Sequence, residues 1–404
     1  MNDIKLLIKR FKENELIAYV LYSRKCYRKL IGKLFFEVQI LADNRTKILR
    51  KEINCIQILE PELLKYFKDD YLDGLDNIPV VSDTIKFRVP GHSINIISKI
   101  TLLCKTEGQE IINKKEYFGE KLKVILNSNK YWRDFLGEKV SLFTNLSTNN
   151  NIKNLLNKII EEVCGFCNLE LRFPVQYYIT NSILDIYGIS RDFPITETNC
   201  LTAGNKVLVC LYSEKFLKNI ITHETVHALL YQNYFIKKNN YLHWQTLCLE
   251  GYCQYVMNCL CKKKDSYIRF GNAIKNLYIL DFCELKEKIF SENYDMGDII
   301  IQYEILPYIF EKWNEESNLL SDILCNFDKS KIIERKINKY FNLAVEYIEN
   351  KQILDLNKKY NNLYIVFFKN VKMVNDRKQY YKCVGQYRCD IEMLRYCDCV
   401  KEFL

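Results

Sequence analysis

Residues 222–230 read THETVHALL, and this short stretch decides how the rest of the chain is interpreted. It contains His223, Glu224 and His227 in the pattern His-Glu-x-x-His. Positions four apart lie on one face of a helix, so both imidazoles could reach one zinc ion at roughly 2.1 Å. Glu224 would lie beside that ion, where a carboxylate can accept a proton from metal-bound water. The stretch therefore predicts a helix with two zinc ligands and a general base.

Chance explains this pattern poorly. The chain has 404 residues and four histidines, His92, His223, His227 and His243. At that frequency, the pentapeptide would arise at random in about two of every thousand chains of this length. An exposed helix with two incidental histidines is the alternative interpretation.

A catalytic zinc ion needs a third protein ligand and an open fourth position. Glu250 is the candidate, because it follows His227 by 23 residues within WQTLCLEGYCQY, residues 244–255. The apolar residues before it argue against a merely solvated charge, although an ordinary helix position is the alternative. Gly251 would let the two ligand-bearing helices approach closely.

The flanking sequence predicts the elements that would position these residues. Apolar residues at helical spacing predict helices at about 152–164, 213–231, 244–261, 266–280 and 297–313, and Gly165 would cap the first. Runs rich in β-branched and aromatic residues predict strands at 175–180 and 206–212.

With these motifs the chain resembles the gluzincins of the peptidase MA clan, particularly the aminopeptidase N-like branch. The family pattern is His-Glu-x-x-His, then a helix with Glu-Gly, then Tyr-x-x-Gly opening a later helix. The corresponding segments are HETVH at 223–227, LEGYCQY at 249–255 and YDMG at 294–297. The resemblance covers roughly residues 150–320 and implies a zincin-type catalytic domain.

The resemblance implies a role for each matching residue. His223, His227 and Glu250 would hold one Zn²⁺, and Glu224 would be the general base. Tyr294 would donate to the tetrahedral oxygen of the reacting peptide, a contribution of about 3 to 4 kcal/mol. Tyr294 is one of 29 tyrosines, and Tyr303 and Tyr308 lie nearby in the sequence, so an incidental residue is the alternative.

Two further expectations concern the substrate and the metal's surroundings. In the family, the strand before the metal helix pairs with extended substrate by strand addition. The residues that would do so here are Lys206, Val207, Leu208, Val209 and Cys210. His243, two turns before Glu250, is a candidate for a second-shell or substrate contact, with a surface histidine as the alternative.

One departure from the family bears on specificity. The aminopeptidases of this branch carry Gly-x-Met-Glu-Asn, whose acid binds the free amine of the substrate. This chain has Thr202, Ala203, Gly204 and Asn205 instead. An endopeptidase, or a peptidase for one dedicated peptide, therefore fits better than an aminopeptidase.

We expect an α+β chain in three parts. A strand-rich mixed N-terminal domain would span 1–146, the zincin-type domain with its small mixed sheet 150–320, and a mainly helical region 321–404. The polar stretch STNNN at 147–151 would link the first two.

The last part is basic and rich in cysteine. Residues 328–382 hold 13 Lys and Arg against 6 Asp and Glu, which places +7 of the total +9 charge there. Nucleic-acid binding is an alternative function, but helical and strand periodicity would bury most of the interleaved aromatic side chains, which favours a solvated basic face. The tail cysteines match no zinc-binding spacing that we recognise, and CGFC at 164–167 is an isolated pair.

Composition limits the remaining classes. With 48% apolar and 27% charged residues, the chain matches folded globular proteins and not disordered or collagen-like ones. It has no run of 18 apolar residues and no recognisable signal segment at its start, and its 17 cysteines lack framework spacing. We therefore expect a cytoplasmic zinc metallopeptidase that acts on peptide or protein substrates away from membranes. A zinc-stabilised scaffold without activity is the main alternative.

Overall fold

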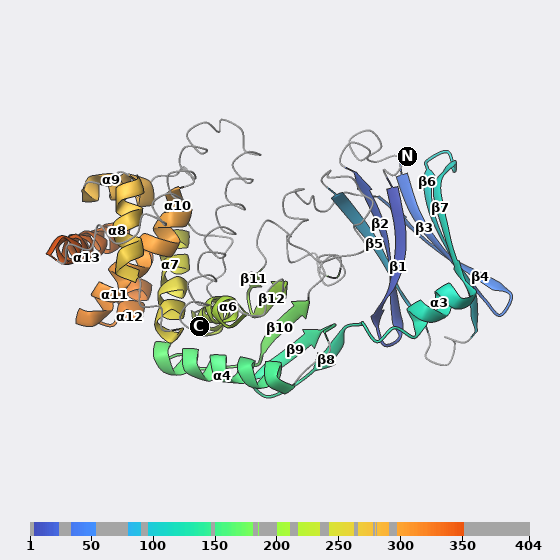
Figure 1. Ribbon diagram of the computed structural model, residues 1–404, viewed down its shortest axis with the longest axis horizontal. Helices are drawn as coiled ribbons and strands as arrows, with labels where there is room; N and C mark the ends of the chain where they lie inside the picture. The colour runs from blue at the N-terminus through green and yellow to red at the C-terminus, as the bar shows by residue number, and fades with distance from the viewer. Residues whose placement is uncertain are drawn as a thin grey trace, which may run out of the picture. The chain divides into compact units, whose positions relative to one another are not determined.

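A computed structural model of the 404-residue chain underlies the description that follows. It describes residues 4–23, 34–53, 80–89, 96–146, 150–180, 185, 200–210, 217–234, 242–261, 266–277, 279, 281–290 and 297–350. These residues form helices and several small sheets (Figure 1). The expectation of a chain that mixes α and β structure is confirmed.

The chain divides into two compact units. The first comprises residues 1–157 and 173–217, and the second comprises 158–172 and 218–404. These units differ from the three predicted domains, 1–146, 150–320 and 321–404. One sheet crosses the first predicted boundary, because β9 (Val140–Thr144) pairs in parallel with β10 (Val175–Thr180).

Two antiparallel sheets form the N-terminal part of the first unit. The three-stranded sheet has the order β1-β2-β5, with β1 (Ile4–Lys12), β2 (Glu15–Ser23) and β5 (Val80–Arg88). The four-stranded sheet has the order β4-β3-β6-β7, with β3 (Leu34–Ala42), β4 (Arg45–Glu52), β6 (Ile97–Thr106) and β7 (Ile111–Phe118). The helix α3 (Gly119–Leu126) follows β7.

A common apolar core joins these two sheets. Alternate residues of β1 and β2, such as Leu6 and Ala18, pack with Phe36 and Val38 of β3, and Leu122 of α3 joins them. Alternation directs every second side chain to one face of a strand, so two such faces can enclose a core. This part is strand-rich, as predicted.

A mixed sheet completes the first unit. Its order is β11-β12-β10-β9-β8, with β8 (Arg133–Phe135), β11 (Cys200–Ala203) and β12 (Lys206–Cys210). The strands β9, β10 and β12 are parallel, and the outer strands β8 and β11 run antiparallel to their neighbours. Val207, Leu208 and Val209 are all buried, which is typical of a central parallel strand.

Helices make up the described part of the second unit. They are the second half of α4 (Asn150–Cys167), α6 (Leu217–Tyr234), α7 (His243–Leu260), α8 (Ser266–Leu277), α9 (Phe282–Phe290), α10 (Gly297–Ile300), α11 (Leu306–Glu316), α12 (Leu319–Cys325) and α13 (Ser330–Asn350). Between α10 and α11 lies a π-helical turn, η4 (Ile301–Ile305). None of the described helices is both long and apolar enough to cross a membrane.

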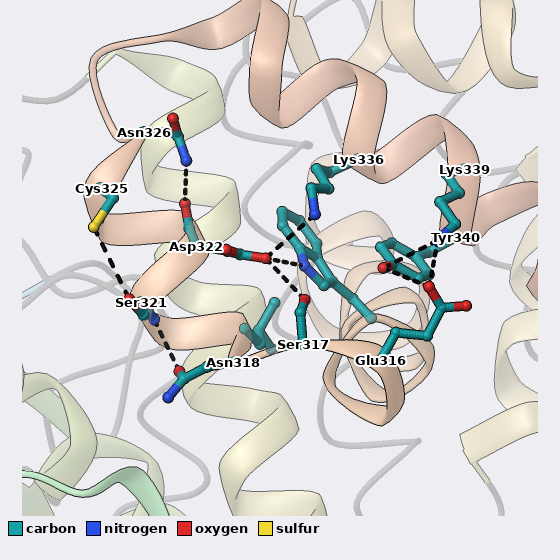
Figure 2. Close-up of polar contacts among 12 residues, drawn as sticks. Glu316, Ser317, Asn318, Ser321, Asp322, Cys325, Asn326, Lys336, Lys339 and Tyr340 are labelled. Carbon is teal, nitrogen blue, oxygen red and sulfur yellow. Dashed lines mark hydrogen bonds and ion pairs between the residues drawn. The ribbon is translucent and has the colours of Figure 1, made fainter.

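The helices α11, α12 and α13 are joined by polar contacts as well as by apolar packing (Figure 2). Asp322 of α12 accepts hydrogen bonds from Trp313 Nε1 at 3.0 Å and from the Ser317 hydroxyl at 2.8 Å. Tyr340 of α13 stacks on Trp313 with ring centroids 5.6 Å apart. The predicted C-terminal boundary at 321 therefore falls inside one packed group of helices.

Two helix predictions need correction. The first predicted helix continues past Gly165 to Cys167, and the left-handed residue is Asn168, with φ of 52°. Asn tolerates that conformation because its short side chain can hydrogen-bond locally. The predicted continuous helix at 297–313 is interrupted by η4.

Candidate metal centre

The helix α6 presents two imidazoles one turn apart. The ring centroids of His223 and His227 are 5.1 Å apart, and both side chains are nearly buried. Several apolar residues of α6, such as Ile221 and Val226, are fully buried. A helix buried on most of its surface holds its side chains in fixed rotamers, so the two rings have little freedom to move apart.

Glu250 of α7 meets this imidazole pair, as predicted. Its Oε2 lies 3.2 Å from Nε2 of His223 and 3.5 Å from Nε2 of His227. One donor atom from each residue lies within 4.8 Å of the others. A tetrahedron whose vertices lie about 2.1 Å from its centre has edges of about 3.4 Å, so both distances match those between zinc ligands.

The chemistry of the three residues also fits a metal. Nε2 of His227 is buried and has no hydrogen-bond partner among the residues that the structure describes. A buried polar atom without a partner is costly, and a bound cation would satisfy its lone pair. Two imidazole nitrogens and one carboxylate oxygen are the donor set of many catalytic zinc sites.

The position of Glu250 follows from the packing of α7. Residues Leu247–Asn258 are all buried, so this helix is surrounded by protein on every side. A Cβ atom at Gly251 would lie 2.8 Å from Cβ of Leu306 and 3.2 Å from Cε2 of Phe310. Gly251 therefore permits close contact between α7 and α11. The prediction that it would permit close contact between α6 and α7 needs correction.

Glu224 lies on α6 beside the first ligand and is half-buried. Successive residues of a helix are rotated by about 100°, so Glu224 is on the flank of the His223–His227 face. Its role as general base stays a prediction.

The other two predicted residues have different outcomes. Tyr294 lies outside the described residues. His243 begins α7, and its Nε2 lies 3.1 Å from Oδ2 of the buried Asp298 at the start of α10. This contact links two helix ends, and the second-shell role of His243 stays a prediction.

The predicted substrate-binding strand requires a correction. β12 covers Lys206–Cys210, but both of its edges are paired: with β10 along its whole length and with β11 from Lys206 to Val209. A strand between two neighbours has no free row of backbone N–H and C=O groups for substrate. Strand addition at Lys206, Val207, Leu208 and Val209 is therefore wrong, and at Cys210, which pairs with β10 alone among the described strands, it stays a prediction. In the described part of this sheet, the edge strands are β8 and β11.

The sequence analysis gave no role to Tyr303. This half-buried tyrosine lies in η4, and its hydroxyl donates to Oε2 of Glu250 at 3.5 Å, a long hydrogen bond. Its ring centroid is 6.0 Å from that of His223. A signal was present in Pro307, four residues later, because proline disturbs a regular helix at that distance.

Two cysteine thiols, those of Cys167 and Cys248, are poor candidates for nucleophilic or redox chemistry. Burial raises the pKa of the Cys167 thiol, the second cysteine of CGFC, to about 12, and it raises that of Cys248 to about 12. Such thiols stay protonated at neutral pH and are poor nucleophiles.

The helix α13 contains most of the described part of the basic C-terminal stretch, for which nucleic-acid binding was the alternative function. In α13, Tyr340 and Phe341 are buried in contact with other aromatic rings, so neither can stack on a base. Residues 351–404, with the tail cysteines and most of the basic stretch, lie outside the described residues.

Comparison with protein-family models, with curated proteins and with solved structures finds no match for this chain.

Proposed function

We propose that this protein is a zinc metallopeptidase of gluzincin type, with His223, His227 and Glu250 as metal ligands. The observation that carries the proposal is the convergence of three donor atoms, from two helices, within 4.8 Å of one another. The two ligand-bearing helices, α6 and α7, are elements that a zincin-type domain requires. The choice of peptide bonds as substrate rests on the motif resemblance alone.

In hydrolysis, the three ligands would hold the metal and Glu224 would transfer a proton. The bound metal would supply a Lewis acid and lower the pKa of a coordinated water to about 7. Glu224 would accept the proton from that water and pass it to the leaving amine. The three ligands use only three vertices of a tetrahedron, which leaves one position for water or substrate.

The metal content tests the first part of the proposal. Elemental analysis of the native protein should find about one zinc per chain, and His223→Ala should lose it. His92→Ala removes a histidine outside the motif and should keep the metal. If the native protein contains and binds no zinc, the proposal is overturned.

Glu224→Gln separates catalysis from metal binding. The variant should retain about one zinc and lose hydrolysis of a quenched-fluorescent peptide library, because the amide cannot accept the proton. Glu287→Gln changes an exposed acid of α9 in the same way and should cleave like the native protein. A native protein that holds zinc but cleaves no peptide would favour the scaffold alternative.

A further inference from the structure

Tyr303 is a further polar side chain at the candidate metal centre. Its hydroxyl contacts Oε2 of Glu250, and this oxygen is also the one nearest the two imidazoles, at 3.2 and 3.5 Å. The hydroxyl therefore donates to the same carboxylate oxygen that would bind the metal. It comes from η4, which packs against α7 at the level of Glu250.

The π-helical turn explains how Tyr303 reaches this position. Leu306 donates its backbone N–H to the carbonyl of Ile301, five residues earlier, as in a π-helix. Pro307 has no N–H, and in a regular α-helix its ring would clash with the carbonyl of Tyr303. The extra residue in the turn relieves that clash and changes the direction of the side chains that precede it. Such turns occur frequently at functional sites.

The opposite side of the turn is held by a buried ion pair. Glu304 is directed to Arg269 of α8, with Nη1 and Oε2 3.7 Å apart and both side chains at most 10% exposed. Tyr308, one turn further, packs on Phe270 of the same helix with ring centroids 4.9 Å apart. The turn is thus fixed between α7 and α8, so Tyr303 does not depend on a flexible loop for its position.

We propose that Tyr303 is a positioning residue of this metal centre, which holds the Glu250 carboxylate in the orientation that ligation requires. The proposal rests on the proposed function, since it assigns a role at the same site. A partner that hydrogen-bonds a ligand fixes its rotamer before the metal arrives, and loss of such a partner typically costs 10- to 100-fold in metal affinity.

The test is a metal titration of the full chain and of Tyr303→Phe, which removes the hydroxyl and keeps the ring. Zinc affinity is measured by competition with a chromophoric chelator, and Co²⁺ absorption reports the ligand geometry. The control is Tyr308→Phe, the same change one turn further along on the face that packs against α8. We expect Tyr303→Phe to bind zinc at least 10-fold more weakly than the control and to show altered Co²⁺ bands.

Each outcome separates the two proposals. If the native chain and both variants bind zinc equally, with the same Co²⁺ spectrum, the role of Tyr303 is overturned and the metal site stands. If both variants lose affinity equally, the effect is general destabilisation, and the positioning role is again overturned. If the native chain binds no zinc, the proposed function fails together with this inference.

Discussion

At the scale of single residues, Oε2 of Glu250 lies close to both imidazoles, as the proposed function requires. Two imidazole nitrogens face it at 3.2 and 3.5 Å, inside a buried region. A proton or a metal ion between these groups would make the contacts favourable, and the contact with His223 is short enough for a hydrogen bond. Removal of a charge from water is costly without such a partner, and under the proposed function that partner is the metal ion.

Gly251 gives a prediction about the support of that ligand set. In Gly251→Ala the new Cβ would lie 2.8 Å from Cβ of Leu306, which has no flexible end that can yield. We expect the free energy of unfolding to fall by about 1 to 3 kcal/mol, as is typical of overpacked cores. Chemical denaturation measured in the presence of a chelator would separate this effect from metal binding.

Gly165→Ala is the matched control for that substitution. Gly165 is an exposed residue of α4, and a Cβ there would meet nothing within 4 Å. Because Ala favours the helix by about 1 kcal/mol over Gly, this variant should gain stability. Equal effects of the two substitutions would show that the contact between α7 and α11 is looser than described.

The sequence predicts most securely the residues whose relation is local, and Glu250 was found from its Glu-Gly segment rather than from helical geometry. His223 and His227 are four positions apart on one helix, so their geometry follows from helical periodicity alone. The place of Tyr303 depends on an irregular turn, and the neighbour of Gly251 depends on which helix packs there. Neither can be obtained from the spacing of residues along the chain.

At the scale of elements, the polar contacts of α11, α12 and α13 predict a dependence of stability on pH (Figure 2). Burial raises the pKa of Asp322, but hydrogen bonds from Trp313 and Ser317 and the charge of Lys336 lower it by more. The pKa of this carboxyl in the folded protein therefore lies below its ordinary value of 3.8.

The direction of the effect follows from this lowered pKa. The carboxylate of Asp322 stabilises the fold fully above the unfolded value of 3.8, and this contribution is lost as the pH falls through the lower folded value. In Asp322→Asn, the free energy of unfolding should therefore decline less between pH 5 and pH 2, values chosen to bracket the ordinary pKa. Urea denaturation at a series of pH values would measure the decline.

Asp328→Asn provides the comparison, because it removes an exposed acid from the connection between α12 and α13. This variant should keep the acid-dependent loss of the native protein. A decline that is identical in all three proteins would mean that Asp322 is paired to the same extent when the chain is unfolded.

Element interiors are easier to predict than their ends. The helix at 244–261 was predicted to within a residue of α7, since apolar residues recur along its whole length and no glycine or proline interrupts its second half. The end of α4 was misplaced because Gly165 is compatible with both a cap and a helix interior, and tertiary packing decides between them. The π-helical turn was missed because apolar periodicity does not distinguish it from an α-helix over five residues.

At the scale of the whole molecule, the order of strands in the mixed sheet shows which segments pair, and local sequence patterns do not. The strands on either side of the 147–151 stretch pair with each other, so one sheet spans the predicted linker. The pairing of β12 on both edges likewise depends on β10 and β11, which lie elsewhere in the sequence. Long-range strand pairing has no signature in the sequence of a single strand.

The division into two units leads to the last prediction. All three proposed ligands belong to the second unit. A ligand that binds only the folded state stabilises it by RT ln(1 + [L]/Kd), about 2.7 kcal/mol when free zinc exceeds the dissociation constant 100-fold. This stabilisation should therefore appear in the elements that carry or support the ligands, because the first unit contributes none of them.

Hydrogen exchange of the full chain with and without zinc would measure this effect. Peptides from 217–234 and 243–260 should exchange up to about 100-fold more slowly with zinc, which corresponds to 2.7 kcal/mol. Peptides from 34–42 and 97–118 should be unchanged, and His223→Ala should abolish the difference. Equal protection of both groups of peptides would show that the units unfold together, whereas slower exchange confined to 34–118 would place the metal in the first unit.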